Sequence, residues 1–268
     1  MAGGTSRKNH SEIGSSFIHF NYTPNQDKAT PSMMGDIHNG VMLASKPIFL
    51  GGQGGLVGPV KINFGCITAA GSIIRKSELK KDRLLLGGAF KEISFPRQYD
   101  VYKNISHVFN NNIYYIAGLI SLKSWYKHIR SLFVYDNLSK ALLQGMRETL
   151  DDCINERIHR FKIFCEKLKV SKEILLTKNN IKGQSKTILM HDKAIKQFQY
   201  AETVFKVKYE KNQLNSDGRQ FIEIIKQKIT NEQTSYISAI QNLDLEEHKK
   251  GSDWLFNIEH SMVEKLLI

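Results

Sequence analysis

The stretch KPIFLGGQGGLVGPVKINFGCITAAGSII, residues 46–74, carries an aliphatic or β-branched residue at every sixth position. Small residues, mostly glycine and alanine, lie between these positions and suit tight turns. A six-residue step of this kind is typical of a triangular parallel β-helix, in which each short strand points one side chain inward. An ordinary β-sandwich would alternate with period two, and this stretch does not. The repeated positions are Leu50, Leu56, Ile62, Thr68 and Ile74.

The period changes to three or four residues in the second part of the chain, beyond Asn104, which indicates amphipathic helices. One apolar stripe runs from Leu138 to Leu168, longer than an average helix. We therefore expect a β + α fold: a short left-handed parallel β-helix of hexapeptide repeats, followed by an α-helical region of antiparallel long helices. The expected domains are the β-helix at 1–90, a linker at 91–103 and the helical domain at 104–268.

Composition and charge indicate which classes of partner and location to expect for this chain. The chain is 41% hydrophobic and 24% charged, and its net charge of +12 would attract polyanions. No basic block alternates with aromatics as in single-strand binders, so a nucleic-acid partner is not expected. No apolar run reaches the roughly 18 residues of a membrane span, and the first residues lack the apolar core of a secretory signal. We expect a cytoplasmic protein with no membrane partner.

The three cysteines show no C-x-x-C spacing, so neither a disulfide framework nor a zinc site is expected. Cys153 and Cys165 fall among apolar residues of a predicted helix, which predicts small buried hydrophobic side chains.

Four ordered motifs carry a resemblance to a known family. The region from Ser11 to Gly88 resembles the C-terminal β-helix of the bifunctional N-acetylglucosamine-1-phosphate uridylyltransferase/glucosamine-1-phosphate acetyltransferase and of related sugar-phosphate nucleotidyltransferases. The resemblance does not extend to the helical region. The motifs are Ile13-Gly14 with Ile18 and Asn21-Tyr22; Met34-Gly35-Asp36; Leu56-Val57-Gly58-Pro59-Val60-Lys61-Ile62 with Gly65; and Ala69-Ala70-Gly71.

This resemblance implies that the β-helix forms a trimer and that acetyl-CoA lies between neighbouring coils. Asn21 and Tyr22 would bind the substrate or the acyl carrier, and Lys28 would meet the sugar phosphate, as a cation can. Gly52 and Ala70 would line the acetyl-CoA channel through their backbones, because small residues permit close approach. Each residue also has a plain structural alternative: a solvated loop lysine, turn residues, or a pair that caps and packs the loop.

Three departures from the family pattern bear on catalysis. The family's catalytic histidine would fall before the first residue of this sequence, and the nearest substitute is His19, a candidate general base or a structural histidine. The stretch Ile37 to Pro47 exceeds the family spacing. A basic residue expected after the last coil falls on Gly87, with Arg75, Lys76 and Arg83 nearby.

The nucleotidyltransferase half of the family has no counterpart here. No G-x-G-x-R opening loop precedes the repeats, and the GGQGG run at 51–55 is not a P-loop, because no Gly-Lys-Ser/Thr follows it. The chain is therefore expected to work as a separate subunit or to be a split or truncated product.

The leading functional hypothesis is a transferase: acetyl-CoA-dependent N-acyl transfer to an amino-sugar phosphate or a nucleotide sugar such as UDP-N-acetylglucosamine, in a homotrimer, without a required metal. A base would deprotonate the amine, and backbone donors would hold the developing oxyanion. The alternative is a non-catalytic trimerisation or regulatory module that docks a separate nucleotidyltransferase subunit. A third hypothesis, a polyanion-binding protein, rests on charge alone.

Overall fold

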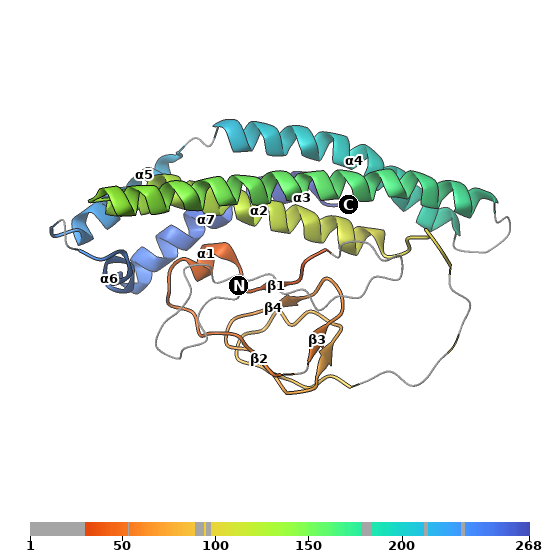
Figure 1. The fold of residues 1–268 in the computed structure, drawn as a ribbon, viewed down its shortest axis with the longest axis horizontal. Helices are drawn as coiled ribbons and strands as arrows, with labels where there is room; N and C mark the ends of the chain where they lie inside the picture. The colour runs from red at the N-terminus through yellow and green to blue at the C-terminus, as the bar shows by residue number, and fades with distance from the viewer. Residues whose placement is uncertain are drawn as a thin grey trace.

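A computed structural model describes residues 30–52, 54–88, 94, 98–177, 184–211, 214–231 and 234–268. Long helices form one side of the molecule and short strands the other (Figure 1). The helices are α1 (Ile37–Gly40), α2 (Ile105–His128), the 3-10 helix η1 (Arg130–Phe133), α3 (Asn137–Thr177), α4 (Gln184–Lys211), α5 (Ser216–Lys228), α6 (Tyr236–Gln241) and α7 (Leu245–Leu266). The strands are β1 (Met33–Met34), β2 (Phe49–Leu50), β3 (Gly55–Leu56), β4 (Lys61–Ile62), β5 (Ile67–Thr68), β6 (Ile73–Ile74) and β7 (Leu84–Leu85).

The central helix of the helical layer is α2, which contacts α3, α4, α7 and α1. Most of its residues are buried, as expected of a helix surrounded by others. Large aromatic side chains fill the space between the helices. The ring centroids of Trp125 and Trp254 lie 6.4 Å apart, and Phe221 lies 5.9 Å from Trp125. These three side chains are fully buried and anchor α2, α5 and α7 to one another.

The start of α7 is fixed by a local hydrogen-bonded cap. The carboxylate of Asp244 accepts a hydrogen bond from the Glu247 backbone N–H, and the Glu247 carboxylate accepts one from the Asp244 N–H. This reciprocal pair satisfies two donors that the helix itself leaves unpaired. It fixes the entry of the helix that supplies much of the pocket described below.

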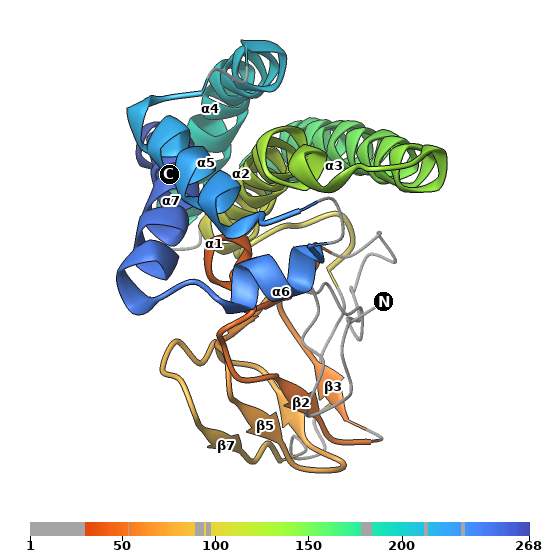
Figure 2. The same ribbon diagram turned by 90° about the vertical axis from the view of Figure 1, so that its left-hand side faces the viewer.

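The strand layer consists of two-residue strands that pair in parallel. Three small sheets form, with strand orders β1-β4, β2-β5-β7 and β3-β6. Residues at every sixth position from Phe49 to Ile73 begin strands β2 to β6. Figure 2 shows β2, β5 and β7 side by side at the end of the molecule away from α3 and α4.

A small aliphatic core lies inside the strand layer. Leu56, Ile62 and Ile74 are buried in it, and Leu50 packs against it. Thr68, the remaining repeated position, is also buried, and its hydroxyl accepts a hydrogen bond from the Gly51 N–H at 3.0 Å.

The fold class expected from the sequence is wrong. The described chain is mainly helical, and its short strands belong to three separate small sheets rather than to a continuous left-handed β-helix. The physical reason lies in the turns. Small residues recur so often at 46–74 that each strand between two turns is only two residues long. Most of the buried apolar surface belongs instead to the helices.

Two narrower expectations can be compared with the structure. None of the described helices has an apolar run long enough to cross a bilayer. The prediction for the helical cysteines is confirmed for Cys165, which is buried, and wrong for Cys153, which is exposed. Burial raises the pKa of the Cys165 thiol well above its ordinary value.

Candidate functional site

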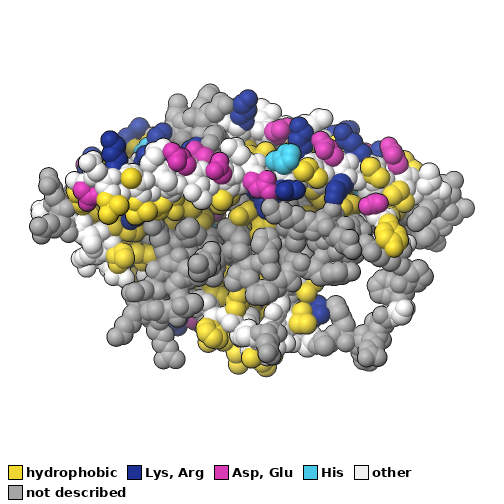
Figure 3. Space-filling model, in the orientation of Figure 1, with side chains coloured by type: hydrophobic (Ala, Val, Ile, Leu, Met, Phe, Trp, Pro, Cys, Tyr) yellow, Lys and Arg dark blue, Asp and Glu magenta, His cyan; other side chains and the backbone are white. Residues whose placement is uncertain are grey.

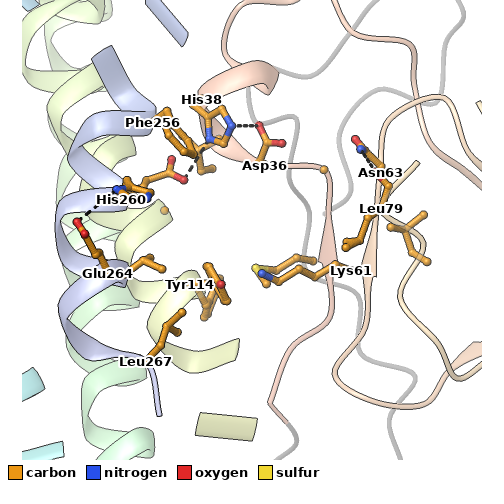
Figure 4. A pocket seen from close by; sticks show the side chains of 18 of the residues that line it. Asp36, His38, Lys61, Asn63, Leu79, Tyr114, Phe256, His260, Glu264 and Leu267 are labelled. Atoms are coloured by element: carbon orange, nitrogen blue, oxygen red, sulfur yellow. Dashed lines mark hydrogen bonds and ion pairs between the residues drawn. The ribbon is translucent and has the colours of Figure 1, made fainter. Parts of the chain in front are cut away.

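A pocket of about 520 Å³ lies between the strand layer and the helices (Figure 4). Residues of β1, α1 and β4 form one wall, and residues of α2 and α7 form the other. The lining combines apolar side chains with eight charged or amide side chains, four of which are the carboxylates of Asp36, Glu78, Glu259 and Glu264. The polar groups that matter below are Asp36, His38, Lys61, Glu259 and His260.

Lys61 reaches across the pocket from the first position of β4. Its neighbour Ile62 points into the strand core, so strand alternation turns Lys61 outward, toward the helices. Figure 4 shows the side chain extended toward Tyr114 on α2, and Lys61 Nζ lies 3.1 Å from the centre of that ring. An aromatic face attracts an ammonium group through the ring quadrupole. Tyr114 therefore helps to hold the lysine in place.

The ammonium group of Lys61 lies against the Tyr114 ring in a pocket that also holds carboxylates. It forms no ion pair with any of the residues that the structure describes. Burial lowers the pKa of Lys61 to about 8, although the more distant charges of Glu259 and Asp36 act in the opposite direction. A cation that is partly desolvated and unpaired favours an anionic ligand.

His38 is held between two carboxylates. Its Nδ1 lies 3.1 Å from Glu259 Oε2 on α7, and its Nε2 lies 3.3 Å from Asp36 Oδ1. Ser121 on α2 donates a hydrogen bond of 2.7 Å to the other oxygen of Glu259. Asp36 is also the N-cap of α1, where it accepts a hydrogen bond from the Asn39 N–H. This network joins α1, α2 and α7 at one end of the pocket.

The network sets the charge of the histidine. Burial on its own lowers the pKa of His38, but the hydrogen bond and charge of Glu259, with the charges of Asp36 and Asp253, raise it above the ordinary value of 6.5. Both ring nitrogens face carboxylate oxygens, so the doubly protonated imidazolium fits the geometry. In that form His38 has no free nitrogen to accept a proton. The two carboxylates therefore favour the protonated form of His38.

Aromatic and titratable side chains of α7 form the rim of the pocket. The Phe256 ring lies 5.4 Å from the His38 ring and 5.3 Å from the His260 ring. Glu264 Oε2 lies 3.7 Å from Nδ1 of the exposed His260. The rim thus combines an apolar surface for a ligand body with polar groups that solvent reaches. No cluster of metal-ligating side chains occurs among the residues that the structure describes.

Four of the site residues predicted from the sequence, His19, Asn21, Tyr22 and Lys28, lie outside the described residues. The other two, Gly52 and Ala70, are exposed in turns of the strand layer, and neither lines the pocket. They lie close to each other, because the Gly71 N–H donates a hydrogen bond of 2.9 Å to the Gly52 carbonyl. A Cβ added to Gly52 would meet no atom within 4 Å, so its backbone is open to approach.

The sequence gives weak signals for the residues that form the pocket. Lys61 is a charge between two aliphatic residues, Val60 and Ile62, and this marks an outward-facing strand position. Nothing local links it to Tyr114 or Glu259, which follow far along the chain on separate helices. The pocket exists only because the strand layer packs against α2 and α7.

A scan against models of protein families finds no match to this chain, and searches of curated proteins and of solved structures find no similar protein. The resemblance inferred from the sequence motifs stays a prediction.

Proposed function

We propose that the pocket binds a small organic molecule with an anionic group, and that Lys61 receives this group. The observation that carries the proposal is an unpaired, partly buried ammonium group that faces an apolar cavity of about 520 Å³. A lysine in such a position acts as a point charge for a phosphate or carboxylate. The cavity volume falls within the range of small-molecule sites.

A sugar phosphate is the ligand class that we favour. The phosphate would meet Lys61, the sugar ring would lie along the Phe256 side of the pocket, and Asp36 would accept a hydrogen bond from a hydroxyl or amine. This assignment retains, as a proposal, the amino-sugar phosphate or nucleotide sugar expected from the sequence. Its support is that Lys61, the Phe256 ring and the carboxylate of Asp36 line a single pocket.

Acetyl-CoA-dependent acyl transfer stays a prediction. The homotrimer, the separate nucleotidyltransferase partner, the non-catalytic alternative and the cytoplasmic location also stay predictions. The pocket depends on none of them.

Isothermal titration calorimetry tests the binding proposal. The probes are N-acetylglucosamine 1-phosphate and UDP-N-acetylglucosamine, each titrated near pH 8 in two buffers that differ in ionisation enthalpy. An anion beside Lys61 stabilises the ammonium form, so binding should draw protons from the buffer. Lys61→Met should weaken binding by roughly 10- to 100-fold, the range for a hydrogen bond to a charged group.

Two matched variants complete the experiment. Lys61→Arg keeps the charge and cannot titrate, so it should bind without proton uptake. Lys46→Met removes an exposed lysine of the strand layer and should bind as the wild type does. The proposal is wrong if neither probe binds, or if Lys61→Met binds as tightly as the unaltered protein.

A further inference from the structure

An apolar ladder runs across the outer face of the β2-β5-β7 sheet. It consists of Phe49, Ile67 and Leu84, which are cross-strand neighbours in the parallel register. Their exposed fractions are 61%, 46% and 66%. The alternate residues of the same strands, Leu50 and Leu85, pack against the strand core. The sheet therefore places apolar side chains on both faces, and among the described residues the outer ones stay exposed while the inner ones pack against the strand core.

The ladder extends beyond the last strand. Leu86 follows Leu84 by two positions and is 77% exposed. Hydrophobic side chains gather at the lower end of the molecule in Figure 3, which is the end formed by the strands. Continuous exposed apolar surface of this kind usually marks a contact with a partner or a membrane.

Basic side chains lie at the end of the apolar ladder where its strands begin. The Lys46 carbonyl accepts a hydrogen bond from the Gly65 N–H, and the Arg83 carbonyl accepts one from the Ile67 N–H at 2.8 Å. Lys80 and Lys81 precede Arg83 in the same exposed segment. Asp82 pairs with Lys46 at 3.0 Å, whereas Lys80, Lys81 and Arg83 form no ion pair within the described part of the chain.

We propose that the apolar ladder and its basic edge rest on an anionic lipid surface. Apolar side chains that enter the interface, together with Lys and Arg beside the headgroups, are the combination that peripheral membrane proteins use. The net charge of +12 opposes close contact between two copies and favours an anionic partner. Nucleic acid would use the charges but not the apolar ladder. This proposal departs from the sequence-based expectation that no membrane partner exists.

Vesicle co-sedimentation of the full chain tests this inference. Vesicles of phosphatidylcholine alone are compared with vesicles that contain about 30% phosphatidylserine, at low salt and at about 0.5 M salt, where surface charges are screened. We expect binding to the anionic vesicles only, and release at high salt. Lys80→Glu/Lys81→Glu should lower binding by at least about 30-fold, since each basic residue near the surface contributes roughly fivefold.

A second pair of variants separates the apolar contribution from the charges. Phe49→Ser/Leu84→Ser should weaken binding to anionic vesicles. Leu138→Ser/Leu142→Ser alters two leucines of α3 that are also largely exposed, and it should leave binding unchanged. Circular dichroism checks that each variant is folded, which is expected because all four positions are exposed.

Three results would overturn the inference. These are failure to bind the anionic vesicles, equal binding to both vesicle types, and equal binding by Phe49→Ser/Leu84→Ser and the wild type. Sedimentation velocity adds a further test: self-association that the Phe49→Ser/Leu84→Ser variant abolishes, without any vesicle binding, would assign this face to contacts between copies instead.

Discussion

The helical layer and the strand layer use opposite means of close packing. Between the helices, large side chains such as Trp125, Trp254 and Phe161 fill the space and are fully buried. Between the strands, the backbones themselves come close, and a Cβ added to Gly51 would lie 2.5 Å from the Ala69 backbone. Close packing in the helical layer therefore depends on large buried side chains. In the strand layer it depends on glycine, which has no side chain to keep the backbones apart.

The pocket lies where these two layers meet. Its strand wall contributes Lys61 and Asp36, and its helical wall contributes Tyr114 and Glu259. In such a pocket the helices form a rigid wall, and the strands hold polar side chains close to that wall. Changes in each layer should accordingly have different effects on stability.

Trp125→Ala should have the greatest effect, because it removes a fully buried ring that contacts Trp254, Phe221 and Tyr236 and leaves a cavity. The expected loss is about 3–5 kcal/mol in the free energy of unfolding. Urea denaturation followed by far-UV circular dichroism measures it. Leu138→Ala, on the exposed face of α3, should change stability by less than about 0.5 kcal/mol. Similar losses for the two variants would contradict the burial described for the helical layer.

Gly51→Ala should destabilise the strand layer by up to about 3 kcal/mol, because the new methyl group meets backbone atoms that cannot rotate away. The neighbouring Gly52→Ala is the control. Its added Cβ meets no atom within 4 Å, so its effect should stay within about 0.5 kcal/mol. Equal effects at the two positions, in the same urea titration, would show that the strand backbones are not in close contact.

Glu259→Gln should reduce stability by about 2 kcal/mol near pH 6, because it removes the charge that His38 faces but keeps an oxygen for Ser121. The folded-state pKa of His38 is raised, so this stabilisation is fully present below pH 6.5 and is lost as the pH rises through the folded pKa. The difference between wild type and variant should therefore shrink from pH 6 to pH 9. A difference that grows with pH would contradict a charged His38.

Lys61→Met should have the smallest effect and the opposite sign. It replaces an unpaired ammonium group by an apolar side chain of similar length and should stabilise the protein at pH 7 by about 1 kcal/mol, after the loss of the Tyr114 contact is included. Wild-type Lys61 has a lowered pKa, so its unfavourable contribution should disappear as the pH rises from about 8 to 10.5. Chemical denaturation at pH 7 and at pH 10 measures both effects, and a destabilised variant at pH 7 would be the contrary result.

Only parts of this structure could be predicted from the sequence. Each repeated position of the six-residue step at 46–74 is the second residue of a two-residue strand. The step does not specify how many residues of each strand pair with a neighbouring strand. The fold class inferred from it was wrong. The change to a helical period after Asn104 agrees with helix α2, which begins at Ile105.

The pocket was beyond the reach of sequence patterns for a different reason. Lys61 and Glu259 come together through the packing of β4 against α2 and α7, and no periodicity encodes that packing. Asp36 stood out only as part of a Met-Gly-Asp turn, whereas the structure makes it a helix cap and a partner of His38. Contacts between distant elements decide such roles, and local propensity does not.

The titration of Lys61 itself tests most directly whether this lysine is a desolvated, unpaired binding group. The side-chain ¹³Cε signals of labelled protein can be followed against pH by NMR, with the Lys61 signal assigned by its absence from Lys61→Arg. A midpoint near 8 is predicted, and it should move upward when saturating N-acetylglucosamine 1-phosphate is added. A midpoint at the ordinary lysine value of 10.5, unchanged by the ligand, would contradict the proposed role of the pocket.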